Sequence, residues 1–170
     1  MGDRCHATYS DSDSYPSGLG TDIVKFILGL SGHEDYMEMD KRVRQITWVD
    51  MNATPSPELQ RKYSEMGFSE KRVVKLAEWW YLLYKLRGAA ALPAIQSGNL
   101  EHMIESTDFL QEHILCEWAY FIDFENQTLE TWTFGHHVAN VSFQDLKRYG
   151  ESYMDLLKRA LYEQKKSQGT

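Results

Sequence analysis

The sequence predicts a single α+β domain over residues 1–170, in which helices pack on a largely antiparallel sheet. Alternation of apolar and polar residues, the pattern of a half-buried strand, is clearest in residues 114–134. Apolar residues three and four positions apart, the pattern of an amphipathic helix, are clearest in residues 69–88. These patterns do not alternate strictly along the chain, which disfavours a parallel sheet with helical crossovers.

Three elements are predicted at the N-terminal end. Residues 4–9 alternate and predict a short strand, and residues 10–20, which are rich in Ser, Asp, Gly and Pro, predict a loop. Thr21 or Asp22 then caps a helix with a regular apolar stripe, and Gly32 ends this helix.

A strand and a helix are predicted next. Residues 45–51 form the strand. Thr54 and Pro55 then begin the helix, as N-cap and first helical residue, and the helix ends near Gly67.

The helix over residues 69–88 carries one apolar stripe, which is expected to face the core. Trp80 belongs to this stripe, whereas Trp79 lies about 100° away around the helix, where it can reach a pocket or a partner. The stripe consists of Val73, Leu76, Ala77, Trp80, Leu83 and Tyr84.

The C-terminal part contains the strongest hairpin signal of the chain. Residues 114–124 and 128–134 alternate on either side of a polar turn, and the first strand is so apolar that the hairpin is expected in the centre of the sheet. A further strand is predicted at 138–141, and a last helix at 151–166. The inward residues of this helix are expected to be Tyr153, Leu156, Leu157 and Leu161.

Composition argues against several classes of protein. The formal net charge is −7, which disfavours nucleic acid as a partner because phosphates are bound by Lys and Arg. No apolar run reaches the roughly 20 residues of a membrane span. The two cysteines, Cys5 and Cys116, do not make a disulfide scaffold, so the protein is expected in the cytoplasm with both reduced. No cofactor is predicted.

Charge is unevenly distributed along the chain. Residues 88–146 contain nine acids and no Lys or Arg. This acidic stretch is either an ordinary solvated face or a surface that meets a basic protein partner. The acids are Glu101, Glu105, Asp108, Glu112, Glu117, Asp123, Glu125, Glu130 and Asp145.

Four histidines and Cys116 are candidate zinc ligands. None of their spacings is the tight pair of a structural zinc site, so no metal is predicted. The histidines are His102, His113, His136 and His137, of which the last two, beside Gly135, are expected in a surface loop.

The loop over residues 10–20 is the most unusual segment. It joins a strand to a helix, and Gly18 and Gly20 permit positive φ and a close approach of the backbone to a ligand. The helix that follows offers N–H groups and a positive dipole end, which suit an anion. The alternative is a rigid loop in which Asp and Ser side chains bond to their own backbone.

Glu117 is a second candidate for chemistry. It lies on the strand face opposite Cys116 and Trp118, and a carboxylate buried there needs a partner to offset its desolvation. Arg4, on the first predicted strand, is a candidate partner. Such a pair marks either a functional site or a structural ion pair.

Short motifs spread over most of the chain carry a resemblance. They are Met1-Gly2, Arg4, Thr8-Tyr9, Asp13-Ser-Tyr-Pro-Ser-Gly-Leu-Gly20, Asp22-Ile-Val, Trp80-Tyr81-Leu-Leu83, Cys116-Glu-Trp-Ala-Tyr-Phe-Ile-Asp123 and Thr128-Leu-Glu130. In this order they resemble a family of small proteins of phages, bacteria and fungi, to which no activity is attached. Asp3, Cys5, Ser10 and Asp11 depart from its usual Thr, Gly, Asn and His. The resemblance implies a shared site that keeps Asp13, Tyr15, Gly18, Gly20 and Glu117.

These residues predict a polar pocket formed by the first strand, the loop and the strand at 116–120. The pocket is expected to bind a small anionic, nucleotide-like ligand, and hydrolysis, with Asp13 or Glu117 as general base, is an open alternative. The ligand-binding residues are expected to be Arg4, Tyr9, Tyr15, Ser17, Gly18 and Gly20. The alternative function is a non-catalytic module whose acidic stretch, 88–146, binds a basic protein surface.

Overall fold

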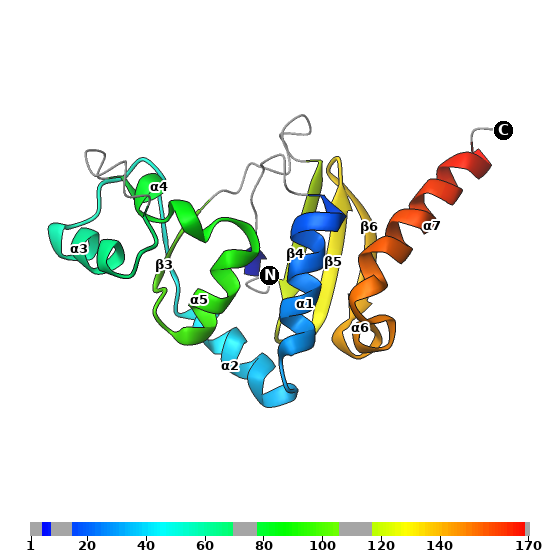
Figure 1. Cartoon of the computed structure of the whole chain (residues 1–170), viewed down its shortest axis with the longest axis horizontal. Coiled ribbons are helices and arrows are strands. Elements are labelled where there is room, and N and C mark those ends of the chain that lie inside the picture. Colours follow the sequence, from blue (N-terminus) through cyan, green and yellow to red (C-terminus); the bar gives the residue numbers. More distant parts are fainter. Residues whose placement is uncertain (1–4, 8–14, 70–77, 106–116, 169–170) are drawn as a thin grey trace.

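The computed structural model describes residues 5–7, 15–69, 78–105 and 117–168, and its main sheet has four antiparallel strands (Figure 1). This architecture, with helices beside the sheet, confirms the predicted α+β class. In spatial order the strands are β1 (Cys5–Ala7), β4 (Trp118–Asp123), β5 (Thr128–Thr133) and β6 (His136–Ser142).

Strands β4 and β5 are the predicted hairpin, and they hold the two central positions of the sheet. Their turn is closed by Asp123, whose carboxylate accepts hydrogen bonds from the Asn126 backbone N–H at 2.8 Å and from its side-chain amide at 2.9 Å. Gln127 ends the turn with φ 55°. This value lies in the left-handed region, which residues other than Gly, Asn and Asp rarely adopt.

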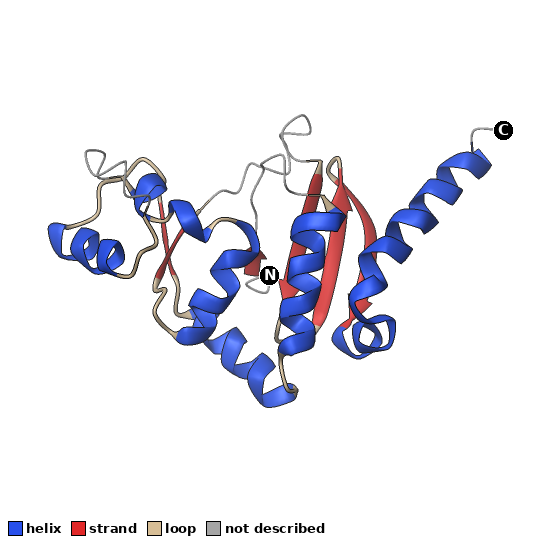
Figure 2. Ribbon diagram, viewed as in Figure 1, coloured by secondary structure: helices blue, strands red, loops and turns tan. Residues whose placement is uncertain are grey.

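Helix α1 (Thr21–Gly29) lies along the face of β4 and β5 (Figure 2). The period of the predicted apolar stripe explains this packing, because it gathers the buried side chains on one side of the helix. The fully buried side chains of this layer are Ile23, Val24 and Ile27 from the helix, and Tyr120, Ile122 and Leu129 from the strands.

Two helices follow the sheet in place of the one predicted. They are α6 (Phe143–Tyr149) and α7 (Tyr153–Gln168), separated by a 3₁₀ turn at Gly150–Ser152. Tyr153 is buried as predicted, but Leu156 is 44% exposed, so its predicted inward position is wrong. The reason is that Tyr153, Met154 and Leu157 form the face of α7 that packs on the core, and Leu156 lies about 100° around the helix from this face. Beyond these residues, α7 projects away from the sheet (Figure 1).

A second group of elements, the β2–β3 region, lies beside the main sheet (Figure 1). Its short strands pair in parallel, unlike those of the main sheet. The predicted strand at 45–51 is confirmed as β2, whereas β3 was not predicted. The elements are α2 (His33–Arg44), β2 (Thr47–Val49), α3 (Pro57–Glu65), α4 (Trp79–Leu82), α5 (Ala91–Ser97) and β3 (His102–Ile104).

Helix α3 begins two residues later than predicted. Ser56 is its N-cap, accepting a hydrogen bond from the Leu59 N–H at 3.3 Å, and Pro57 is its first residue. The sequence repeats the same cap pattern two residues apart, and the structure uses the second copy rather than Thr54 and Pro55.

The predicted long helix over 69–88 is wrong in its C-terminal half. Glu78 is extended, with ψ 153°, and only α4 and short 3₁₀ turns follow it. The N–H groups of Trp79 and Trp80 donate hydrogen bonds to the carbonyls of Ala53 and Met51. The backbone at the start of α4 is therefore bonded to the turn that follows β2. Residues 70–77 lie outside the described residues.

The roles expected for the two tryptophans are reversed. Trp79 is buried, and Trp80 is half-buried with the Arg87 guanidinium 4.0 Å from its ring centroid. The break at Glu78 removes the helical phase on which the prediction rested.

His136 and His137 are exposed as expected, but they belong to strand β6 rather than to a loop.

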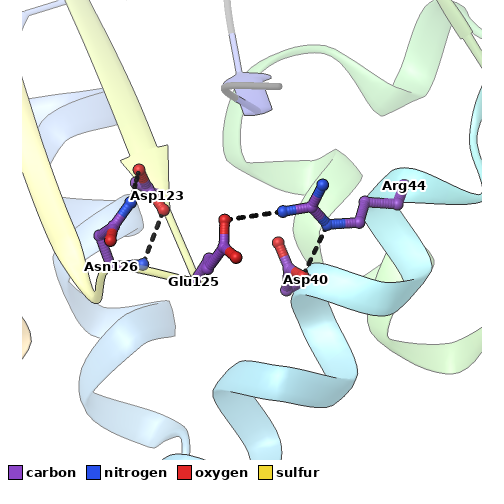
Figure 3. Close-up of polar contacts among 5 residues, drawn as sticks. All are labelled: Asp40, Arg44, Asp123, Glu125 and Asn126. Atoms are coloured by element: carbon purple, nitrogen blue, oxygen red, sulfur yellow. Dashed lines mark hydrogen bonds and ion pairs between the residues drawn. The ribbon is translucent and has the colours of Figure 1, made fainter. Parts of the chain in front are cut away.

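An ion-pair network joins the β2–β3 region to the main sheet (Figure 3). Arg44, the last residue of α2, donates from Nε to Asp40 at 2.8 Å and from Nη2 to Glu125 in the β4–β5 turn at 2.8 Å.

Within the described ranges, no helix is both long and apolar enough to span a membrane.

Candidate functional site

The predicted loop site is only partly within the described residues. Arg4, Tyr9 and Asp13 lie outside them. Ser17 and Gly18 belong to a wide helical turn, Pro16–Gly20, that continues directly into α1. Ser17 is exposed and Gly18 is half-buried.

This turn occupies N–H groups that the anion-cradle prediction left available. The Gly18 and Gly20 N–H groups bond to the Tyr15 carbonyl at 3.0 and 3.4 Å, and the Thr21 N–H bonds to the Pro16 carbonyl. The helix therefore starts at Pro16, and Gly20, not Thr21 or Asp22, precedes α1.

Gly20 has a packing function in the structure. Its φ of −59° is ordinary, so the positive φ expected there is not used. A Cβ on Gly20 would lie 2.8 Å from Tyr120 Oη and 3.1 Å from Met154 Sδ. Gly20 thus lets the start of α1 approach β4 and α7 closely, as the loop glycines were expected to approach a ligand.

Tyr15 and Glu117, two of the predicted site residues, lie together although they are far apart in the sequence. The Tyr15 hydroxyl is hydrogen bonded to the Glu117 carboxylate, and this bond, with the nearby negative charge, raises the pKa of Tyr15. Tyr15 is 47% exposed and Glu117 is half-buried, so the pair faces solvent.

A cavity of about 340 Å³ lies in the β2–β3 region. It is formed where the end of α2, strand β2, the end of α5 and the start of β3 meet, and its size is at the lower end of small-molecule pockets. Its walls combine two apolar residues with several polar ones. The lining residues are Arg42, Gln45, Thr47, Ile95, Gly98, Leu100, Glu101 and His102.

Arg42 brings a positive charge to this cavity. Its Nε donates a hydrogen bond to Glu38, one helical turn earlier, at 2.9 Å. Its guanidinium lies against Gly98, where a Cβ would clash with Nη1. Gly98 ends α5 in the left-handed conformation, with φ 77°, so glycine is favoured there both by the backbone and by the space that Arg42 needs.

His102, another lining residue of the cavity, is fixed by two aromatic residues. Its Nδ1 shares a hydrogen bond with the Tyr63 hydroxyl at 2.8 Å. Its ring stacks on Trp79, with centroids 4.8 Å apart and an interplanar angle of 23°. Burial lowers the pKa of His102 and raises the pKa of Tyr63, so both groups are neutral near pH 7.

Glu101 also lines the cavity, but its charge is already paired. Lys62 donates a hydrogen bond to its carboxylate at 2.6 Å, and this bond lowers the pKa of Glu101. Its backbone N–H donates to the Tyr63 hydroxyl at 3.1 Å, and its carbonyl accepts from the Thr47 N–H at 2.8 Å. Arg42, which also lines the cavity, is paired with Glu38 rather than with Glu101.

The sequence prediction missed most of this cavity. It named His102 only as a candidate zinc ligand, and it did not single out Arg42 or Gln45. Among the described residues, no group of three or more His, Cys, Asp or Glu side chains is arranged to hold a metal ion.

The acidic stretch is partly neutralised by bases from outside it. Among the acids that the structure describes, Glu101 pairs with Lys62, Glu125 with Arg44, and Asp145 with Arg148. These contacts reduce the charge that the stretch presents to a basic partner.

Comparison with known proteins finds no match: neither a family model, nor a curated protein, nor a solved structure matches the chain.

Proposed function

We propose that the protein binds a small anionic molecule in the cavity of the β2–β3 region. The observation that carries this proposal is the arrangement of Arg42 and the fixed His102 imidazole around one cavity of about 340 Å³. The ion pair between Lys62 and Glu101 matters equally, because Lys62 neutralises that carboxylate and reduces its repulsion of an anion.

The chemistry of the walls favours a carboxylate or phosphate attached to a small apolar or planar body. A guanidinium binds the two oxygens of such a group through parallel N–H bonds. Gln45 and Thr47 add side chains that both donate and accept hydrogen bonds. Ile95 and Leu100 supply the apolar surface that buries the rest of a ligand.

The proposal is tested with adenosine 5′-monophosphate, inorganic phosphate and the uncharged adenosine as probes. We expect the two anions, but not adenosine, to shift the amide resonances of Gln45 and Thr47 in ¹H–¹⁵N spectra. Arg42→Gln should weaken binding about tenfold or more, since a charged hydrogen-bonded contact is lost. Unchanged resonances at millimolar phosphate and nucleotide would overturn the proposal.

A matched pair of glycine variants separates the position of Arg42 from backbone strain. Gly98→Ala and Gly67→Ala both place a side chain at positive φ, 77° and 75°, but only the first pushes against Arg42. We expect Gly98→Ala to weaken anion binding and Gly67→Ala to leave it unchanged at temperatures where both variants are folded. Equal weakening by both would show that strain, not the position of Arg42, controls the site.

The contact between Tyr15 and Glu117 favours a second candidate site, the one predicted from the sequence. It brings together two of the motifs on which the family resemblance rests. Hydrolysis of an anionic ligand, with Asp13 or Glu117 as general base, belongs to this candidate. Glu117→Gln should then abolish hydrolysis while leaving nucleotide binding at Arg42 intact. Binding of a basic protein by residues 88–146, and a cytoplasmic location, stay predictions.

A further inference from the structure

The Tyr63 hydroxyl is the centre of a buried hydrogen-bond chain beside the cavity. Tyr63 is 0% exposed, yet its oxygen contacts two residues that line the cavity. It accepts the Glu101 backbone N–H at 3.1 Å and shares a hydrogen bond with His102 Nδ1 at 2.8 Å. One hydroxyl therefore fixes two neighbouring residues of the wall.

These two bonds decide which nitrogen of His102 carries its proton. The Glu101 N–H can only donate, so the Tyr63 oxygen accepts that bond. The hydroxyl hydrogen then needs an acceptor, because a buried donor without one costs about 1–3 kcal/mol. His102 Nδ1 lies within hydrogen-bond distance and accepts it, which leaves the proton of the neutral imidazole on Nε2.

The imidazole ring is held in this orientation from two sides. Trp79 stacks on its face, and Tyr63 meets it edge-on with an interplanar angle of 88°. A flip of the ring would exchange Nδ1 for carbon and break the bond to Tyr63. The nitrogen that is not bound to Tyr63 is thereby kept as a fixed donor.

We infer that His102 donates a hydrogen bond from Nε2 to an oxygen of the bound anion, while Arg42 binds the same anionic group from the α2 side. This inference rests on the proposed function and deepens it, because two donors select a ligand group with two acceptor oxygens, a carboxylate or a phosphate. Tyr63 is a positioning residue that acts through His102. An ammonium group in place of the oxyanion is rejected, since it would set donor against donor.

The charged groups around His102 are consistent with a neutral imidazole. Lys62 opposes its protonation and Glu101 favours it, but these two charges are paired with each other at 2.6 Å. Burial, the largest influence, lowers the pKa of His102. His102 therefore recognises an anion as a neutral donor rather than as a cation.

The tautomer is tested directly by long-range ¹H–¹⁵N spectra of the histidine side chains between pH 7 and 8. His102 is assigned by comparison with His102→Gln. We expect a neutral ring with the proton on Nε2, unchanged across this pH range, and a mixture of tautomers or partial protonation in Tyr63→Phe. A proton on Nδ1 in the wild type would overturn the inference, whatever the affinity for phosphate.

The role of the donor is tested by two substitutions at the same position. The amide nitrogen of Gln reaches the place of Nε2, whereas that of Asn reaches the place of Nδ1. We expect His102→Gln to bind adenosine 5′-monophosphate within about threefold of wild type, and His102→Asn to lose about tenfold or more. His33→Asn, at an exposed histidine of α2, is the matched control and should have no effect.

The outcomes separate this inference from the proposed function. If Arg42→Gln weakens binding but His102→Asn does not, the cavity binds anions without His102 and the inference fails alone. If neither anion perturbs the cavity in the wild type, the proposed function fails and the inference fails with it. Loss of binding in His102→Gln as severe as that in His102→Asn also contradicts a donor at Nε2.

Discussion

The main sheet and the β2–β3 region share one apolar core, but they differ in the polar groups that this core contains. In the sheet, Tyr120, Ile122 and Leu129 are fully buried in an apolar layer against α1. In the β2–β3 region, Tyr63 is equally buried, but its hydroxyl bonds to His102 and to the Glu101 N–H beside a cavity. Apolar packing therefore stabilises both regions, and the β2–β3 region adds a hydrogen-bond chain beside the cavity, where ligand chemistry is expected.

The largest effect is expected from truncation in the central strands. Leu129→Ala should lower the free energy of unfolding by about 2–5 kcal/mol, because a fully buried side chain on a central strand leaves a cavity. Denaturant unfolding measures the change, and phosphate binding by the folded variant should equal that of wild type. A Leu129→Ala protein that is fully stable but binds no anion would reverse the division between the two regions.

A smaller effect is expected from removal of one oxygen in the β2–β3 region. Tyr63→Phe should cost about 1–3 kcal/mol, because His102 Nδ1 and the Glu101 N–H both lose a buried partner. Chemical denaturation measures the loss. Tyr162→Phe is the control, since Tyr162 is 64% exposed on α7 and should unfold like wild type. A Tyr63→Phe protein as stable as this control would mean that the hydrogen-bond chain contributes little.

The two regions also differ in how far the sequence predicts them. The central hairpin follows from two long alternating runs, because a period of two fixes which side chains of β4 and β5 face α1. Helix α2 was not predicted, although Glu34 and Asp35 in its first turn and Arg44 in its last are suitable signals for a helix dipole. Its low apolar content concealed it, and with it the position of Arg42.

The candidate sites show the same limit. Tyr15 was singled out as part of the unusual loop and Glu117 as an acid on an apolar strand that needs a partner, and the two are in contact. The bond between Tyr63 and His102 joins residues 39 positions apart and leaves no periodic trace in the sequence. The break at Glu78 likewise depends on hydrogen bonds to Met51 and Ala53, which a local helical pattern cannot report.

The pH dependence of stability gives a third, smaller difference between the regions. Burial lowers the pKa of His102 in the folded state, so the unfolded chain binds the proton more readily. Stability therefore falls as the pH drops below the ordinary pKa of histidine, about 6.5, toward the lower folded pKa. His102→Gln should lose this part of the pH dependence when melting is compared at pH 7.5 and 5.5. An identical slope in wild type and variant would contradict a buried neutral imidazole.

The smallest effect is expected at the ion pairs that connect the two regions (Figure 3). Glu125→Gln removes the carboxylate that accepts a hydrogen bond from Arg44, a residue 81 positions away in the sequence. Asp40 still pairs with Arg44 inside α2. The side chains of Arg44 and Glu125 are 40% and 56% exposed, so water and salt screen the pair. The expected loss is about 0.2–1 kcal/mol, smaller still at high salt.

Glu125→Gln also tests whether the two regions depend on each other through this contact. Because Arg44 keeps Asp40, α2 should keep its end, and phosphate should bind at Arg42 with wild-type affinity. Glu163→Gln, an exposed charge change on α7, controls for the altered net charge. If Glu125→Gln weakens phosphate binding more than Glu163→Gln does, the turn of the main sheet helps to position α2 at the cavity. The two regions would then form one functional unit rather than a packed sheet beside an independent binding site.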